Sequence, residues 1–222
     1  AISEMDTQGH VTDFPYQPTA DIAAAPDGDV WLTDSLTHHL IRVGADGSAR
    51  VIAPQELSNA SITQVKPAAD GSVWFYDARG GRVGHILADG SLSLRALPFQ
   101  KTNAELAVGA GNAVWLYVGV LGQAIYLPPN GAPKTITPKG TAASVSISTA
   151  WFTVGGDGNL YFSVGRNIVR ITQQGEQSQH ELPTLNAKVQ MVAADPTGTV
   201  WFSETPDPIH GAQWAIIGKF VA

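Results

Sequence analysis

Apolar and polar positions alternate in five similar segments of the chain, and each segment begins with a tight turn that contains Gly. They align without gaps as PDGDVWLTD (26–34), ADGSVWFYD (69–77), AGNAVWLYV (110–118), GDGNLYFSV (156–164) and PTGTVWFSE (196–204). Such turns supply the positive φ of a short hairpin, and the alternation that follows is typical of a half-buried strand. The shared aromatic residues are Trp31, Trp74, Trp115, Tyr161 and Trp201, separated by 43, 41, 46 and 40 residues. A period in the forties predicts a repeated unit that stacks against copies of itself.

The residues around each segment predict three further strands per unit. Small residues precede the turn, as at 23–25 and 193–194, and they suit an innermost strand where neighbouring sheets converge. A third strand and a second Gly turn follow, for example LIRVGADG (40–47), and an outer strand then ends at a Pro. We therefore expect an all-β chain, a β-propeller of four-stranded antiparallel blades with negligible helix. The predicted blades are approximately residues 18–54, 61–99, 104–138, 148–183 and 188–222.

The two ends of the chain predict how the ring closes. The fifth unit stops at IIGKFVA (216–222), after its third strand and without an outer strand. Residues 8–15 have the turn, strand and Pro of an outer-strand segment, with no inner strands before them. We expect residues 9–15 to complete the last blade, because such an exchange protects sheet edges that would otherwise invite aggregation. The prediction is a closed five-bladed ring that forms one domain over residues 1–222.

Charge and composition exclude several classes of partner. The chain has 13 Lys and Arg against 19 Asp and Glu, a net charge of −6 with no basic cluster, so nucleic acid is not expected as a partner. No apolar run approaches the ~18 residues of a membrane span, and a soluble monomer is expected. The absence of Cys fits a reducing cytoplasm and a disulfide-free periplasm equally well, and a signal peptide already removed would leave the same sequence. The compartment stays open.

Acidic residues recur at the end of the second strand, three residues after the shared aromatic. This position holds Asp34, Asp77, Val118, Val164 and Glu204. In a closed ring the three acids would lie on consecutive blades at one end of the channel, where their oxygens could hold Mg²⁺ or Ca²⁺. The alternative is that each acid accepts hydrogen bonds from N–H groups of the following loop.

The loops that follow these acids carry further candidate residues. His38 and His210 could supply a general base near Glu204 and its neighbours. His39, Arg79, Arg82 and Trp214 are candidates for contacts with a bound ligand. The alternative for a lone loop histidine is an ordinary solvated side chain, and for Trp214 it is packing.

The repeats also resemble a known family. The segment DIAAAPDGDVWLTD, followed by LIRVGADG, is similar to the repeat of streptogramin (virginiamycin B) lyases, approximately I-T-x-G-P-D-G-N-x-W-F-T-E and then I-G-R-I-T-P-D-G. The resemblance covers essentially the whole chain, although those lyases have seven blades. It implies a magnesium-dependent elimination that linearises a cyclic depsipeptide at an ester, with two histidines and a glutamate that hold the metal and move the proton.

The resemblance carries over only part of that site. Glu204, in Trp201-Phe202-Ser203-Glu204, matches the glutamate of the W-F-T-E strand end and is the expected catalytic and metal-binding carboxylate. The family's histidines lie about eleven residues ahead of the repeat aromatic, where this chain has Ala20, Thr63, Ala104, Ala150 and Gln190. None of these side chains can accept a proton as imidazole does, so the general base is not carried over.

Three functions remain open at this point. The favoured one is a non-catalytic module that binds a small molecule, peptide or protein at the channel mouth, with a divalent cation as a possible cofactor. The alternatives are a magnesium-dependent lyase, with Glu204 as metal ligand and His38 or His210 as base, and a metal-dependent lactonase-type hydrolase built on the same acids.

Overall fold

The computed structural model describes residues 2–14, 19–34, 36–37, 39–52, 54–99, 102–139, 152–184, 187–195, 197–205 and 216–221. Within this part of the chain the structure is all-β, and its helix consists of three-residue 3-10 turns. No helix among the described residues is long and apolar enough to cross a membrane. The chain divides into two compact units, Ala1–Thr102 and Asn103–Ala222, which we describe separately.

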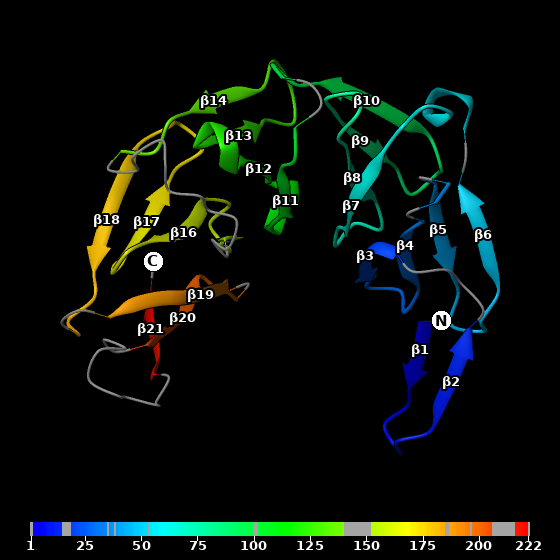
Figure 1. Cartoon of the computed structure of the whole chain (residues 1–222), viewed down its shortest axis with the longest axis horizontal. Helices are drawn as coiled ribbons and strands as arrows, with labels where there is room; N and C mark the ends of the chain where they lie inside the picture. The colour runs from blue at the N-terminus through cyan, green and yellow to red at the C-terminus, as the bar shows by residue number, and fades with distance from the viewer. Residues whose placement is uncertain are drawn as a thin grey trace. The chain divides into compact units, whose positions relative to one another are not determined.

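The first unit contains two four-stranded antiparallel sheets (Figure 1). One sheet has the order β3 (Thr19–Ala24), β4 (Val30–Asp34), β5 (Leu40–Val43) and β6 (Ala49–Ile52). After the 3-10 turn η1 (Gln55–Leu57), the second sheet follows with β7 (Ile62–Pro67), β8 (Val73–Asp77), β9 (Arg82–Ile86) and β10 (Leu92–Ala96). Both sheets confirm the predicted four-stranded antiparallel arrangement, with the strands paired in chain order.

The second unit repeats this architecture and ends in a three-stranded sheet. Its first sheet comprises β11 (Glu105–Val108), β12 (Val114–Val118), β13 (Gln123–Leu127) and β14 (Lys134–Ile136), with the 3-10 turns η2 (Ala110–Asn112) and η3 (Gly119–Leu121). The next contains β15 (Phe152–Val154), β16 (Leu160–Val164), β17 (Asn167–Ile171) and β18 (Gln177–Glu181). The last contains β19 (Lys188–Ala194), β20 (Thr199–Thr205) and β21 (Ile216–Val221), so a fourth strand is absent there among the described residues, as expected.

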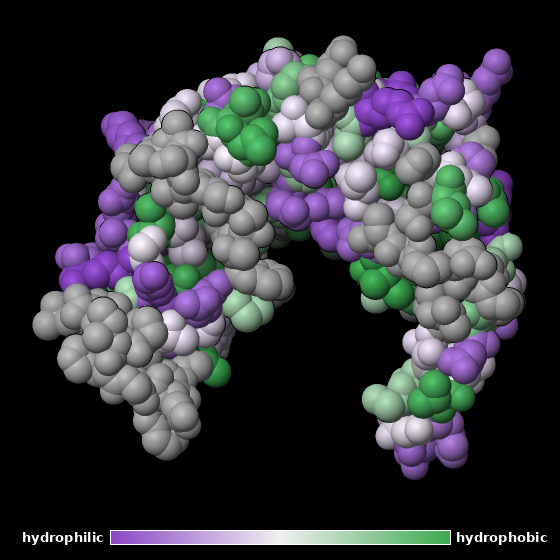
Figure 2. Space-filling view, in the orientation of Figure 1, coloured by the Kyte–Doolittle hydropathy of each residue, from purple (hydrophilic) through white to green (hydrophobic). Residues whose placement is uncertain are grey.

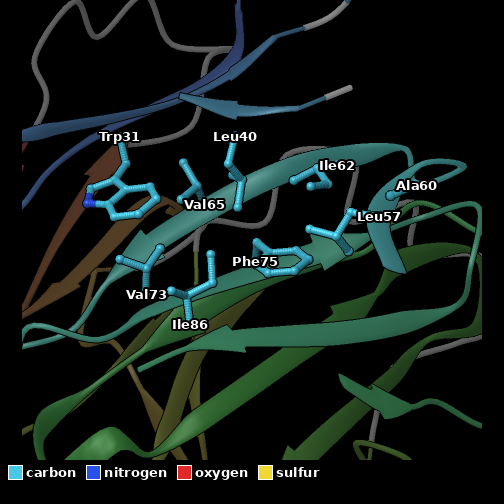
Figure 3. Packing of buried hydrophobic residues seen from close by; sticks show 9 residues of the cluster. All are labelled: Trp31, Leu40, Leu57, Ala60, Ile62, Val65, Val73, Phe75 and Ile86. Atoms are coloured by element: carbon cyan, nitrogen blue, oxygen red, sulfur yellow. The ribbon is translucent and has the colours of Figure 1, made fainter. Parts of the chain in front are cut away.

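Apolar side chains between neighbouring sheets form the core of each unit. In the first unit, Trp31 and Leu40 from one sheet pack with Val65, Val73 and Phe75 from the other (Figure 3). Burial of a large apolar side chain contributes about 1.5–3 kcal/mol, so these contacts hold the sheets face to face. In the second unit the corresponding clusters contain Trp115 with Phe162, and Tyr161 with Val200. The repeat aromatics that are buried in this way are packing residues. This agrees with the sequence pattern, in which small residues on the first strand precede a large aromatic residue on the second.

The third-strand residue opposite each repeat aromatic makes a direct ring or charge contact with it. Arg42 lies 5.7 Å from the ring of Trp31, and His85 stacks on Trp74 with centroids 3.7 Å apart. The Trp115 and Tyr126 rings are 4.9 Å apart, the Arg170 Nε donates to the Tyr161 hydroxyl at 2.9 Å, and Lys219 lies 5.2 Å from Trp201. These contacts are cross-strand pairs, which contribute about 0.2–1 kcal/mol each.

The opening residues form a hairpin, which corrects one sequence prediction. The strand β2 (Val11–Phe14) was expected without a strand before it, but β1 (Ile2–Met5) pairs with it antiparallel, from Ile2 opposite Phe14 to Met5 opposite Val11. The Gly9 N–H donates to the Asp6 carbonyl, as the Gly47 N–H donates to the Gly44 carbonyl between β5 and β6. The hairpin is therefore closed by the same kind of Gly turn that recurs in the repeated sheets.

The hairpin packs on the sheet β3–β6. The Phe14 ring lies against Gly47, where an added Cβ would come within 2.8 Å of the ring, and Gly47 has φ +79°. Met5 and Val11 are 71% and 62% exposed, and Figure 2 shows hydrophobic and hydrophilic atoms side by side over this hairpin. Pairing of β2 with β21, the predicted closure of the last blade, is not found among the described residues, where β2 pairs with β1.

Candidate functional site

The acids predicted at the strand ends lie where the alignment put them. Asp34 and Asp77 are the last residues of β4 and β8, and Glu204 is the penultimate residue of β20. Asp34 and Asp77 belong to the first unit and Glu204 to the second. Their local surroundings differ, and the differences separate structural carboxylates from one that has capacity for a ligand.

Asp77 is completely buried and fully hydrogen-bonded. Its Oδ1 accepts the N–H groups of Ser61 at 2.8 Å and Gly80 at 3.0 Å, and its Oδ2 accepts the Arg82 Nε at 2.7 Å. Burial raises the pKa of a carboxyl, but the amide donors and the guanidinium outweigh it and hold the pKa of Asp77 below its ordinary value. Arg82 also donates to the Glu56 carbonyl in η1 at 2.9 Å. This pair ties three loops together, as the structural alternative predicts.

Asp34 makes a similar local network. Its Oδ1 accepts the N–H groups of Leu36 at 2.8 Å and Thr37 at 3.3 Å, and its Oδ2 accepts the Thr37 hydroxyl at 2.6 Å. Burial raises the pKa of this carboxyl, but the combined effect of the Thr37 hydroxyl, the two amides and His39 is larger and opposite. The pKa of Asp34 therefore lies below its ordinary value. Asp34 thus shapes the loop after β4, in agreement with the structural alternative.

Glu204 differs from both aspartates. It is 3% exposed, and its Oε1 accepts the Thr184 hydroxyl at 2.6 Å. Its Oε2 is buried and has no hydrogen-bond partner among the described residues. An unpartnered buried carboxylate oxygen is costly, and it can be satisfied by a water, an ion or a polar group of a ligand.

The loop candidates are only partly described. His39 is half-buried beside the carboxyl of Asp34, Arg79 is exposed, and Arg82 is engaged by Asp77 and Glu56 rather than free for a ligand. His38, His210 and Trp214 lie outside the described residues, and their predicted roles stay predictions.

Three of the five positions at which the resemblance implies histidines lie at irregularities of the innermost strands. Pairing shifts between Thr19 and Ile22 in β3, between Ile62 and Gln64 in β7, and between Val189 and Met191 in β19. These bulges contain Ala20, Thr63 and Gln190, respectively. A bulge re-aims a side chain and is over-represented beside active sites. The sequence spacing identified the positions, but nothing in it indicated the bulges.

In the last sheet this bulge lies next to the candidate carboxylate. Val189, which precedes the bulged Gln190, pairs with Glu204, and the Gln190 Nε2 donates to the Thr205 hydroxyl at 3.0 Å. An amide cannot take up a proton at neutral pH. The Gln190 side chain thus contacts Thr205, the chain neighbour of Glu204, and it cannot act as a base.

The acids differ in how well they fit a divalent cation. Among the described residues, no three His, Asp or Glu side chains gather closely enough to hold a metal ion. The free Oε2 of Glu204 suits a cation such as Mg²⁺ or Ca²⁺, which takes carboxylate oxygens and completes its shell with water. The Asp77 carboxylate fits poorly, because its oxygens already bind two amides and a guanidinium.

The sequence and the fold are similar to those of known proteins. The virginiamycin B lyase family matches residues 1–207. Selenomethionine-substituted virginiamycin B lyase from Staphylococcus aureus is 23% identical, with a TM-score of 0.70 over 99% of this chain and 76% of that chain. A catalytically inactive histidine-to-alanine variant of the same lyase with quinupristin is 21% identical, with a TM-score of 0.70 over 98% of this chain and 76% of that chain.

Similarity extends to a more distant protein. Regucalcin, a calcium-binding protein from Agrobacterium tumefaciens, is 12% identical, with a TM-score of 0.54 over 95% of this chain and 78% of that chain. At these identities the likeness to solved structures shows the fold alone. Comparison with curated proteins finds no match.

Proposed function

The chain belongs to the virginiamycin B lyase family, and from this premise we propose that it is a ligand-binding β-propeller in which Glu204 is the central binding residue. The proposed ligand is a small molecule or peptide that reaches the end of the last sheet, together with a divalent cation such as Mg²⁺ or Ca²⁺ on the Glu204 carboxylate. The predicted three-acid site would add Asp34 and Asp77. That arrangement stays a prediction, and the proposal rests on Glu204 alone.

The unpartnered oxygen of Glu204 carries this proposal. Thr184 fixes one carboxylate oxygen, and the bulge in β19 brings Gln190 to the neighbouring residue, Thr205. The second oxygen is buried without a donor among the described residues. A buried acceptor of this kind gains free energy when a cation, or the N–H or O–H group of a ligand, reaches it. This site therefore has both a fixed geometry and an unmet bonding capacity.

Binding is favoured over catalysis because the proton-transfer residues are not matched. Elimination and ester hydrolysis both need a base within hydrogen-bond reach of the reacting group or its water. Gln190 occupies one of the repeat positions at which the resemblance implies a histidine. His38 and His210 remain predictions for such a base.

The lyase is the second candidate, and family membership favours it. Glu204 stands at the position of the family's strand-end glutamate, so a base supplied by His210 would complete a rearranged site. A lactonase-type hydrolase would use the same cation and differ in its product. The two enzyme alternatives make distinct predictions for one substrate.

Calorimetric titration with Mg²⁺ and Ca²⁺ tests the binding proposal. We expect uptake at millimolar or lower concentration, and at least about tenfold weaker binding by Glu204→Gln, because the amide oxygen is neutral. Glu176→Gln is the matched control, since Glu176 is exposed and lies on the turn before β18. An equal affinity of the Glu204→Gln variant and the wild type would refute the proposal.

Incubation with a streptogramin B depsipeptide separates the candidates. Elimination opens the ring without a change of mass and creates a conjugated double bond with new ultraviolet absorbance. Hydrolysis adds the mass of one water. The binding proposal predicts neither product, and ring opening that Glu204→Gln abolishes would establish the lyase instead.

We also propose that the sheets form a closed five-bladed ring. Closure would pair β2 with β21 through the edge of β2 that β1 leaves open. The last blade would then contain the strands β19, β20, β21, β2 and β1, one more than the sequence predicts.

A further inference from the structure

A cavity of about 620 Å³ lies between the two four-stranded sheets of the first unit, away from the strand-end acids. We propose that it binds a small molecule with an apolar body and a single carboxylate, independently of Glu204. Trp31, Arg42 and Arg50 line it from the sheet β3–β6, and Val73, Ile86 and Ala88 line it from the sheet β7–β10 and the turn after β9. Volumes of about 300–1,000 Å³ are typical of small-molecule sites.

The second unit contains the same inter-sheet position and serves as an internal comparison. In β12, β13 and β14, Trp115 pairs with Tyr126 and Tyr126 with Lys134. In β4, β5 and β6, Trp31 pairs with Arg42 and Arg42 with Arg50. Tyr126 and Lys134 therefore occupy the places of Arg42 and Arg50.

The turns that face these positions also correspond. The Gly90 N–H donates to the Leu87 carbonyl after β9, as the Gly175 N–H donates to the Thr172 carbonyl after β17. This correspondence aligns Ala88 with Gln173, the second residue of each turn.

Gln173 fills the space between its two sheets. The Gln173 Oε1 accepts the Tyr126 hydroxyl at 2.8 Å, and its Nε2 donates to the Gly158 carbonyl at 3.2 Å. The backbone carbonyl of Gln173 accepts the Lys134 Nζ at 3.3 Å. The Trp115 Nε1 also donates to the Gly158 carbonyl, at 3.0 Å. The hydrogen-bonded Gln173 side chain and Lys134 thus close this position in the second unit.

Ala88 has no side chain that could make these contacts, so the position in the first unit is open. Arg42 turns toward its own sheet, where its Nε donates to Asp29 at 2.5 Å and its Nη2 donates to Asp27 at 2.9 Å. The apolar floor is formed by one end of the core cluster, where Figure 3 shows Trp31 beside Val73 and Ile86. An apolar ligand body would cover this floor.

The charges at the cavity rim specify the polar group of the ligand. Arg50 is exposed, and no ion pair of its guanidinium is found among the described residues, whereas Arg42 is neutralised by two aspartates. A guanidinium binds a carboxylate through paired N–H groups. Asp89 lines the other side of the rim and disfavours a second negative charge. The cavity therefore suits a monocarboxylate rather than a phosphate or a dicarboxylate.

The test compares three probes that differ in one group: 4-phenylbutyrate, its amide 4-phenylbutyramide, and 4-phenylbutylamine. Binding is followed by calorimetry and by the indole N–H resonance of Trp31. We expect the carboxylate to bind at least about tenfold more tightly than the amide, and Arg50→Gln to remove this difference. Lys188→Gln, an exposed substitution in the second unit with the same change of charge, should leave it intact.

Ala88→Gln provides the second arm, because it installs the residue that closes the other unit. Residue 88 is exposed, so the variant should keep the wild-type unfolding temperature while its affinity for 4-phenylbutyrate falls at least about tenfold. The proposal is overturned if no probe binds at millimolar concentration, if the amide or amine binds as tightly as the carboxylate, or if folded Ala88→Gln retains wild-type affinity. None of these results depends on Glu204.

Discussion

Individual carboxylates at equivalent repeat positions have different physical roles, and the donors around each one decide the role. Asp77 satisfies three donors and is structural, whereas Glu204 keeps one buried oxygen without a partner among the described residues. The sequence predicted the positions of the acids. It could not predict this difference, because deciding donors such as Ser61 and Thr184 lie far from the acids in the sequence.

Asp77→Asn should lower the free energy of unfolding by about 2–4 kcal/mol at pH 7, since it leaves the Arg82 guanidinium without its buried partner. The pKa of Asp77 is below its unfolded value of 3.8, so its contribution is complete above that pH and is lost as the pH falls through the folded pKa. The difference between wild type and variant in urea unfolding should therefore shrink as the pH falls from about 4 through the folded pKa of Asp77.

Asp46→Asn is the matched control for this experiment. Asp46 is exposed, and its Oδ1 accepts the Ser48 N–H, a role that an Asn side chain can keep. We expect a change within about 0.5 kcal/mol. Equal effects of the two substitutions would contradict the structural role of Asp77.

His85 gives a second pH dependence of stability, which arises from a basic side chain instead of an acidic one. Burial lowers the pKa of its imidazole below 6.5, and the ring stacks on Trp74. The unfolded chain therefore binds a proton more readily, and stability falls as the pH drops below about 6.5. His85→Phe keeps a ring on Trp74, so its unfolding temperature should vary less than that of wild type between pH 7 and pH 5. Parallel curves for the two proteins would refute this assignment.

Sheets and turns repeat closely along the chain, and the repeat explains both what was predicted and what was missed. The turn and aromatic pattern predicted four complete sheets and the three strands at the end. The strand β1 was missed because Ile2-Ser3-Glu4-Met5 lacks the repeat aromatic and has no strongly apolar alternation. The bulges in β3, β7 and β19 were missed because one additional residue leaves no mark in composition.

Gln173, which closes the space between two sheets of the second unit, is expected to stabilise their packing. Gln173→Ala should lower the free energy of unfolding by about 1–3 kcal/mol, because the buried Trp115 and Tyr126 lose the side chain that closes their cavity and accepts the tyrosine hydroxyl. Gln174→Ala, at the exposed neighbouring position, is the control and should change stability by less than about 0.5 kcal/mol. Similar losses for both variants in urea unfolding would refute the packing role of Gln173.

At the scale of the whole molecule, the prediction is that the opening residues close the ring by pairing with the last sheet. In a closed ring, deletion of residues 1–14 would expose the edge of β21 as well as the surface around Gly47 that Phe14 covers. Amides of residues 216–221 should then exchange with deuterium at least about tenfold faster in the deletion variant. Unchanged exchange in β21, with faster exchange near Gly47, would show that the hairpin serves the first unit alone.

Binding of a cation by the unpartnered oxygen of Glu204 is the proposal on which the function depends. It can be observed by diffraction from crystals soaked in MnCl₂, in which Mn²⁺ replaces Mg²⁺ at oxygen sites. We expect an anomalous peak about 2.0–2.6 Å from a Glu204 carboxylate oxygen, absent in Glu204→Gln. A carboxylate whose second oxygen bonds only to protein groups, with no peak beside it at millimolar Mn²⁺, would refute cation binding at Glu204.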